Sequence, residues 1–270
     1  MKRTSSEDLP ISRRQALGLI GSTVGAFAVA GCGGGDSSTS SSSSSSSSSG
    51  SSSSSSSSSG GSSSSCAVTP EGEIGPYFAD DSASGFDRSN VLSNLDGTDT
   101  QAGVALTLSI TVVDTENDCA ALEGAQIDIW HCNAYGVYSD IAAESTSSQT
   151  WLRGYQLTDS NGLATFTTII PGWYQGRTTH IHVRVRSKYS EASSTSDGTN
   201  TTQVFFPQAL IDTLDTSVAP YSSHGSNSTT NASDRVYSQQ TDGETLLTLS
   251  GSTSSGYTAA YTVGLPITAS

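Results

Sequence analysis

The stretch THIHVRVR at residues 179–186 is the segment from which the fold of this chain is inferred. Polar and apolar side chains alternate along it without interruption, which is the pattern of a β-strand with one buried face. Ile181, Val183 and Val185 share one face, and we expect that face to point into a hydrophobic core. His180 and His182 share the opposite face, where two imidazoles can chelate one ion. A His-x-His pair alone is weak evidence for a metal site.

Other segments of the chain alternate in the same way. Strands are expected at residues 106–112, 127–132, 154–158, 163–170, 179–186 and 257–263. The turn Asp159-Ser160-Asn161-Gly162 predicts a hairpin between its two flanking strands, because Asn-Gly favours the tight turn of a hairpin. A short helix is expected only within 206–214. Short strands separated by Gly and Pro turns indicate an all-β fold, an antiparallel β-sandwich.

Residues 1–31 have the features of an export signal of the twin-arginine and lipoprotein type. Arg13 and Arg14 precede an apolar stretch, 16–30, which is shorter than the roughly 20 residues that span a bilayer. Val29-Ala30-Gly31-Cys32 resembles a bacterial lipobox, so Cys32 is the expected lipidation site. The alternatives are an ordinary secretory signal and a chance Ala-Gly-Cys sequence.

Residues 32–65 are dominated by serine and predict a disordered, flexible tether. Such a tract has nothing to bury, and as a Gly/Ser coil it reaches about 30 Å. The folded domain is therefore expected at 66–270. We expect an exported protein, lipid-anchored in the bacterial cell envelope on the periplasmic side or at the cell surface.

The chain is acidic, with 25 Asp and Glu residues against 11 Lys and Arg residues and a net charge of −14. Because it has no basic cluster, we expect no nucleic-acid partner. The lipid anchor is the only membrane contact that the sequence predicts. The sequence is also compatible with a homo-oligomer.

The cysteines that remain after Cys32 divide into a pair and a single thiol. Cys66 opens the folded domain and Cys119 lies in an acidic loop, so both are expected to be exposed in an oxidising compartment. We predict a disulfide between them. Cys132 lies within an apolar strand and is interpreted as a buried, inert thiol.

Two tyrosines follow turns that can bring them toward the histidine pair. Pro171 and Gly172 form a turn that can aim Tyr174 back over the start of the histidine strand, and another turn presents Tyr138 at a sheet end. Two phenols and two imidazoles form a donor set that favours Fe(III), because phenolate is a hard, anionic ligand. Either tyrosine alone would be interpreted as a packing aromatic.

Taken together and in order, these motifs resemble the intradiol ring-cleavage dioxygenases. The motifs are Thr69-Pro70-Glu71, Gly75-Pro76-Tyr77, the segment 127–138, Trp151-Leu152-Arg153-Gly154-Tyr155, and Pro171-Gly172-Trp173-Tyr174 continuing to His182. Within that family the chain is more similar to the protocatechuate 3,4-dioxygenase β-chain type, since no helical dimerisation segment precedes the sandwich. The resemblance covers 66–270.

The resemblance implies a ligand set for one non-haem Fe(III). Tyr138 would be the equatorial and Tyr174 the axial tyrosinate, with nitrogen ligands from His180 and His182. Arg177 would be the active-site arginine that stabilises charge developing on the substrate ring.

It further implies that Gln203 helps to hold this arginine, and that the enzyme inserts O₂ into a catechol-type ring to give a muconate-type diacid. The alternative is a catalytically inactive, lipid-anchored binding module on the same sandwich. A hydrolase is disfavoured because no Ser-His-Asp motif is identifiable. His131 and His224 receive no role, and the loop Lys188–Asn200, longer than the family pattern, could cover the pocket.

Overall fold

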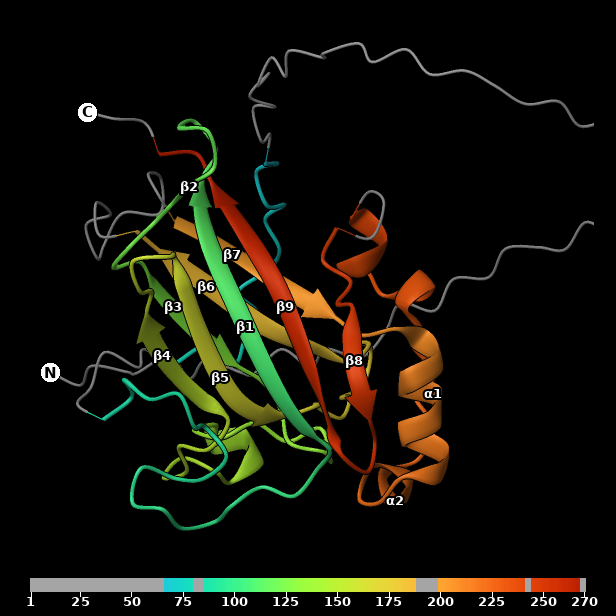
Figure 1. Ribbon diagram of the computed structural model, residues 1–270. Coiled ribbons are helices and arrows are strands. Elements are labelled where there is room, and N and C mark those ends of the chain that lie inside the picture. The colour runs from blue at the N-terminus through green and yellow to red at the C-terminus, as the bar shows by residue number, and fades with distance from the viewer. Residues whose placement is uncertain (1–65, 80–84, 188–198, 241–243, 268–270) are drawn as a thin grey trace, which may run out of the picture. The chain divides into compact units, whose positions relative to one another are not determined.

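The computed structural model describes residues 66–79, 85–187, 199–240 and 244–267 (Figure 1). The expected signal at 1–31, Cys32, the tether at 32–65 and most of the loop Lys188–Asn200 lie outside these residues. Within the described residues, no helix combines the length and the apolar character that crossing a bilayer requires.

Two β-sheets face each other in the folded part and form a sandwich (Figure 1). The strands are β1 Ala105–Asp114, β2 Ala120–Ala121, β3 Gln126–Trp130, β4 Arg153–Leu157, β5 Leu163–Ile169, β6 His180–Arg186, β7 Thr199–Phe205, β8 Leu249–Ser252 and β9 Gly256–Leu265. One sheet has the order β2-β1-β9-β8, with β5 also paired to β1, and the other has the order β4-β3-β6-β7. The all-β sandwich is thus confirmed. One pair departs from the antiparallel rule, because β1 runs parallel to β9.

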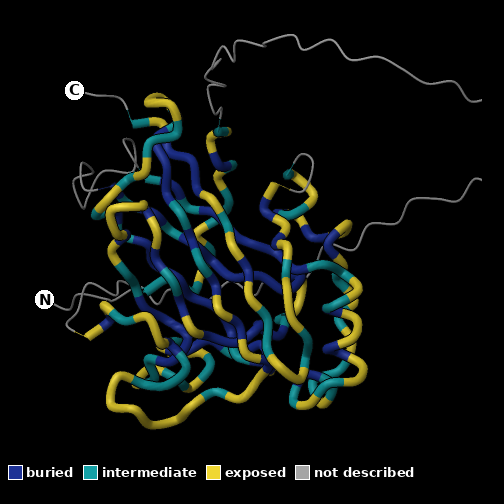
Figure 2. Tube along the Cα trace, in the orientation of Figure 1, coloured by how far each residue is buried: buried dark blue, intermediate teal, exposed yellow. Residues whose placement is uncertain are grey.

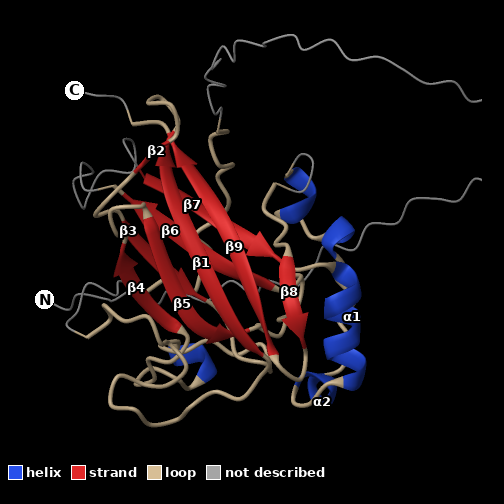
Figure 3. Ribbon diagram, viewed as in Figure 1, coloured by secondary structure: helices blue, strands red, loops and turns tan. Residues whose placement is uncertain are grey.

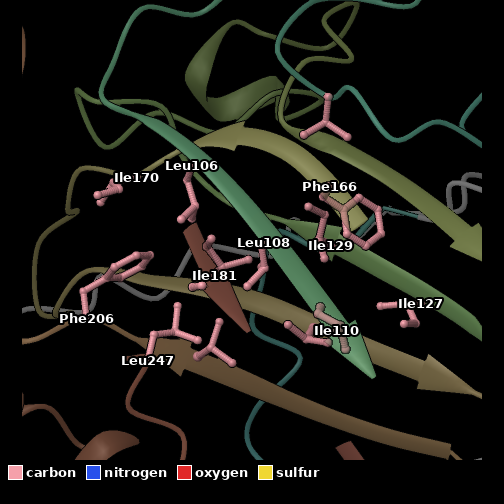
Figure 4. Close-up of a cluster of buried hydrophobic side chains, with 14 of the residues drawn as sticks. Leu106, Leu108, Ile110, Ile127, Ile129, Phe166, Ile170, Ile181, Phe206 and Leu247 are labelled. Atoms are coloured by element: carbon pink, nitrogen blue, oxygen red, sulfur yellow. The ribbon is translucent and has the colours of Figure 1, made fainter. Parts of the chain in front are cut away.

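The main core lies between the inner faces of the two sheets (Figure 4). Leu106, Leu108 and Ile110 of β1 meet Ile129 of β3 and Ile181 of β6, and all five are at most 1% exposed. Figure 2 shows this buried layer running along the centres of the strands. Burial of apolar surface stabilises the sandwich by about 25 cal/mol for each Å² removed from water.

The hairpin predicted around Asp159–Gly162 is wrong, although the turn itself forms. Its hydrogen bonds run from Asp159 N to Leu163 O (2.9 Å) and from Gly162 N to Asp159 O (2.9 Å). After the turn the chain changes sheets, because β4 pairs with β3 whereas β5 pairs with β1. Val112 N, in β1, donates to Gly162 O at 2.8 Å, so the turn is already hydrogen-bonded to the sheet that contains β1. The sequence therefore predicts the local turn but not the long-range pairing of the two strands.

Helices are few among the described residues; most lie at one side of the sandwich near β8, and one short turn lies at the end of the sheets below β4 and β5 (Figure 3). They are α1 Gln208–Ser217, α2 Tyr221–His224 and the 3₁₀ turns η1 Ala142–Glu144, η2 Asn231–Ser233 and η3 Tyr237–Gln239. The helix expected within 206–214 corresponds to α1, which buries Ile211 and Leu214 against the core.

The cysteines pair as the sequence predicts. Cys66 and Cys119 form a disulfide with their Cα atoms 5.8 Å apart, which fastens the start of the folded domain to the loop after β1. Cys132 is a free, buried thiol, and burial raises its pKa, so it stays protonated and unreactive.

Candidate metal centre

Strand β6 places His180 and His182 on the sheet face opposite the main core, as its alternation predicts. That face is not open to water, since the two side chains are 2% and 0% exposed. A second cluster covers it, formed by Trp130, Cys132 and Tyr138 with the partly buried rings of Tyr77, Phe78 and Tyr174. The histidines therefore lie in a second, smaller core on the outer side of one sheet.

The two imidazoles present their Nε2 atoms to each other at 3.2 Å. Nδ1 of His180 lies 2.6 Å from the carbonyl oxygen of Thr178. A carbonyl can only accept, so Nδ1 carries the proton and Nε2 presents a lone pair. Burial lowers the pKa of His180 to about 3 and that of His182 also falls, with the nearby Arg177 cation acting in the same direction on both. Both rings are therefore neutral, the form that binds metals.

Two phenols join the imidazoles. The hydroxyl of Tyr174 lies 3.4 Å from His180 Nε2. The Tyr138 ring is 5.7 Å from the Tyr174 ring and 6.3 Å from the His182 ring, between centroids. Burial raises the pKa of Tyr138 and raises that of Tyr174 to about 12, so both phenols stay protonated unless a cation stabilises the phenolate.

Tyr138 and Tyr174 are each set by a turn after a strand. The turn after β3 closes with a hydrogen bond from Gly136 N to Asn133 O at 3.0 Å. The Glu144 carboxylate accepts a hydrogen bond from the Tyr138 amide. Tyr77, which sequence analysis quoted only as part of a motif, stacks on Tyr138 with ring centroids 4.3 Å apart. The GPY segment that carries Tyr77 was its signal in the sequence.

The donor set fits a hard trivalent cation. The Tyr138 hydroxyl is buried and has no hydrogen-bond partner among the described residues. Leaving such a group unpaired costs about 1–3 kcal/mol, and a cation bound by the phenolate oxygen would remove that cost. No three His, Cys, Asp or Glu side chains gather as a metal site in the described part of the chain.

Arg177 lies beside the phenols and is almost fully buried. Its Nη1 is 3.4 Å from the Tyr174 hydroxyl, and its Nη2 donates to Gln203 Oε1, which places Gln203 where the resemblance put it. The Asp234 carboxylate, which the sequence did not predict as part of the site, accepts from Arg177 Nε at 2.8 Å. Asp234 lies in a polar segment 57 residues away, so no local pattern marks it.

His131, which received no role, packs in the protein interior. Its Nε2 lies 2.7 Å from the Thr168 hydroxyl and its Nδ1 lies 2.8 Å from the Cys132 carbonyl. Burial lowers its pKa to about 4, so it is neutral. It holds the end of β3 to β5 and does not reach the donor set through any of these bonds.

Residues 74–207 match the model of a family described as dioxygenase. A solved intradiol ring-cleavage dioxygenase from Tetranychus urticae is similar at 25% identity and a TM-score of 0.63, over 74% of this chain and 95% of that one. The dioxygenase domain of a carbohydrate-binding fusion from Streptomyces sp. SirexAA-E is similar at 26% identity and a TM-score of 0.53, over 75% and 100%. A 3-chlorocatechol 1,2-dioxygenase from Rhodococcus opacus 1CP shares the fold at 21% identity, with a TM-score of 0.51 and coverage of 74% and 73%. No curated protein matches the sequence.

Proposed function

We propose that this chain is an Fe(III)-dependent enzyme that inserts both atoms of O₂ into a catechol-type ring and releases a muconate-type diacid. The premise is that the chain belongs to the intradiol ring-cleavage dioxygenase family, which rests on residues 74–207 and on the similar solved structures. Tyr138, Tyr174, His180 and His182 would hold the ferric ion. Arg177 would stabilise charge that develops on the substrate ring, and Gln203 would help to hold Arg177. The family assignment supports cleavage of a catechol-type ring with O₂, and the metal and the product are our inference.

One observation carries the proposal. The Tyr174 hydroxyl, His180 Nε2 and His182 Nε2 lie in a chain of contacts of 3.4 and 3.2 Å, with the fully buried Tyr138 phenol alongside. Three donor atoms of the kind that Fe(III) prefers are thus in contact, and the Tyr138 ring lies 5.7 Å from the Tyr174 ring and 6.3 Å from the His182 ring, between centroids. Packing alone does not explain why neutral imidazoles and protonated phenols gather with a hydroxyl left unpaired.

The bound ferric ion would supply Lewis acidity and accept charge from a catecholate, which makes the ring reactive toward O₂. With the ion bound, Tyr174 would be a phenolate, and its oxygen could take a proton from a substrate hydroxyl. Arg177, held by Asp234 and Gln203, directs Nη1 toward the same place and stabilises negative charge that develops on the ring. The rings of Tyr77 and Trp130 exclude water from the donor set.

Absorption spectroscopy of the purified, iron-loaded protein tests this function. Tyrosinate bound to Fe(III) gives a visible charge-transfer band, so we expect a coloured protein whose spectrum shifts when catechol is added. Tyr138→Phe should lose bound iron and O₂ uptake. The matched control Tyr135→Phe, at a tyrosine that is 49% exposed, should behave like the parent. Mass spectrometry should find a product equal to catechol plus both oxygen atoms.

A colourless protein that binds no iron, takes up no O₂ and does not respond to catechol would contradict the proposal. That result would favour the inactive, lipid-anchored binding module. A parent and a Tyr138→Phe variant with equal iron content would instead remove Tyr138 from the ligand set.

We also propose that the protein is exported and held in the bacterial cell envelope by lipid on Cys32. The Cys66–Cys119 disulfide supports this location, since disulfides persist in oxidising compartments. Cys32→Ser should move the protein from the membrane fraction to the soluble fraction. Equal membrane association of the two forms would refute the anchor. Light scattering of the tether-free domain would decide whether a homo-oligomer forms.

A further inference from the structure

Residues 221–234 lie beside residues 170–178, the segment that carries Tyr174 and Arg177, and are bonded to it from end to end. We call 221–234 the support segment. Its first anchor is Tyr221, a fully buried residue of α2. The Tyr221 hydroxyl donates to Ile170 O at 2.6 Å and accepts from Val104 N at 2.9 Å. The support segment is thereby fixed to the sandwich just before the turn that bears the site begins.

The next contacts hold both sides of that turn by its main chain. His224 Nε2 donates to Trp173 O at 3.0 Å, and Trp173 Nε1 donates to Gly225 O at 2.9 Å. The Trp173 and His224 rings pack with centroids 4.4 Å apart. Asn227 Nδ2 donates to Arg177 O at 2.8 Å. The carbonyl before Tyr174 and the carbonyl of Arg177 are therefore both bonded to the support segment.

The last contacts secure the end of the turn. The Thr178 hydroxyl donates to Asn231 Oδ1 at 2.7 Å, and Thr178 N donates to Asp234 Oδ2 at 2.9 Å. The same Asp234 carboxylate holds the Arg177 side chain. Contacts therefore follow one order along both segments, from residue 170 with 221 to residue 178 with 234.

The turn has little else to fix its backbone. Arg177 N bonds to Tyr174 O at 3.1 Å, while Gln175 and Gly176 at its tip are exposed. Gly136 approaches from the other side: a Cβ there would lie 2.0 Å from Trp173 O and 3.3 Å from His224 Nε2. The Trp173 carbonyl thus lies between Gly136, where no side chain fits, and the imidazole of His224, which donates to it. None of the bonds of the support segment uses the Tyr174 side chain, which stays free to change partners.

The support segment lies wholly beyond the part of the chain that the dioxygenase model matches, which ends at residue 207. We propose that it sets the position of the Tyr174–Arg177 turn in the metal centre, and that His224 and Asn227 are positioning residues for ring cleavage. This inference rests on the proposed function for its catalytic consequence. Its structural half, that two side chains outside the site hold the turn in place, stands independently of metal or substrate.

Amide hydrogen exchange on the metal-free chain tests the structural half. The Arg177 and Thr178 amides are hydrogen-bonded, so their exchange reports opening of the turn. We expect His224→Ala and Asn227→Ala each to speed their exchange about fivefold to tenfold, as for the loss of one hydrogen bond. His224→Gln should restore most of the protection, because an amide N–H can also donate to a carbonyl. Ser226→Ala, at an exposed position of the same segment, is the control.

The iron-loaded protein tests the catalytic half. In His224→Ala we expect a shifted charge-transfer band and kcat for catechol lowered about tenfold or more, since small displacements of reacting groups are costly. His224→Gln should recover both. Unchanged exchange at Arg177 and Thr178 in both alanine variants would overturn the inference, as would a His224→Gln variant no better than His224→Ala. If the parent itself binds no iron, the proposed function fails while the exchange result still decides whether the support segment holds the turn.

Discussion

Removing the Asp234 carboxylate should be among the most damaging single changes in this domain. Asp234 is 0% exposed and accepts from Arg177 Nε at 2.8 Å. It also accepts from the backbone amides of Thr178, Val236 and Tyr237 at 2.9, 2.9 and 3.0 Å. Asp234→Ala therefore leaves the buried Arg177 cation without its ion-pair partner and three amide donors without their acceptor.

The expected magnitude follows from those contacts. Breaking a buried ion pair by removing one partner costs about 3–5 kcal/mol, and an unpaired buried donor adds about 1–3 kcal/mol. Because local rearrangement and water recover part of the second cost, we expect Asp234→Ala to lower the free energy of unfolding by about 4–6 kcal/mol. Urea denaturation measures this directly, with an unchanged m-value confirming that the denatured state is the same.

A neighbouring ion pair provides the control. Arg235, next in sequence, pairs with Glu73 at the surface, where the two side chains are 60% and 44% exposed. Exposed pairs contribute about 0–1 kcal/mol, so Glu73→Gln should cost no more than that. In a double-mutant cycle of Asp234→Ala with Arg177→Met, the double variant should lose about 2–3 kcal/mol less stability than the sum of the two single losses, because it leaves no unpaired cation. An Asp234→Ala cost no greater than that of Glu73→Gln, or an additive cycle, would refute the reasoning.

The pH dependence of the Asp234 effect has a definite sign. Burial opposes ionisation, but hydrogen bonds from Arg177 and from the Tyr237 and Thr178 amides outweigh it and lower the pKa of Asp234. Because the folded-state pKa is lowered, ionised Asp234 stabilises the protein at pH values above the unfolded-state pKa of about 3.9. This stabilisation is lost as the pH falls through the folded-state pKa. The difference between the parent and Asp234→Ala should therefore be constant near neutrality and shrink only below about pH 4.

Three further changes have expected outcomes. Burial raises the pKa of Asp215 to about 6, so its ionisation destabilises the fold as pH rises through that value. Asp215→Asn should then raise the free energy of unfolding by about 1–2 kcal/mol at pH 8 but not at pH 4. Replacing Cys66 and Cys119 by Ser opens a disulfide that joins residues 53 apart and should lower stability by about 2–4 kcal/mol in urea titrations. Phe166→Ala empties a fully buried position between the sheets and should cost about 3–5 kcal/mol by the same assay.

The fold was predictable where the pattern is local. Strict alternation in β6 determined both its extent and which side chains face the core, since a strand with one buried face has a period of two. β7 was missed, because its Thr-rich sequence 199–205 has few apolar residues and its burial comes from neighbours. The parallel pairing of β1 with β9 was also missed. Their residues lie about 150 positions apart, and no local period encodes a partner at that separation.

The candidate site divides in the same way. Tyr138, Tyr174, His180 and His182 stand next to turns or strands that a reader can recognise, and the structure brings all four to one face. Asp234 and the remainder of the support segment lie in a Ser- and Asn-rich stretch that reads as loop. Their role comes from contacts made 50 or more residues away. Polar side chains that bond to distant main-chain atoms leave no periodic trace in the sequence.

β6 also links the stability of the domain to its chemistry. Ile181 and Val183 on one face stabilise the sandwich, whereas His180 and His182 on the other face lie in a cluster that leaves buried polar atoms unpaired. A cation that binds the folded state alone would offset that cost, by about 4 kcal/mol when its concentration is a thousand times its dissociation constant. The domain should therefore be most stable once it is loaded with metal. If the metal were loaded before the proposed export, the route would have to carry folded proteins, as the twin-arginine route predicted from Arg13-Arg14 does.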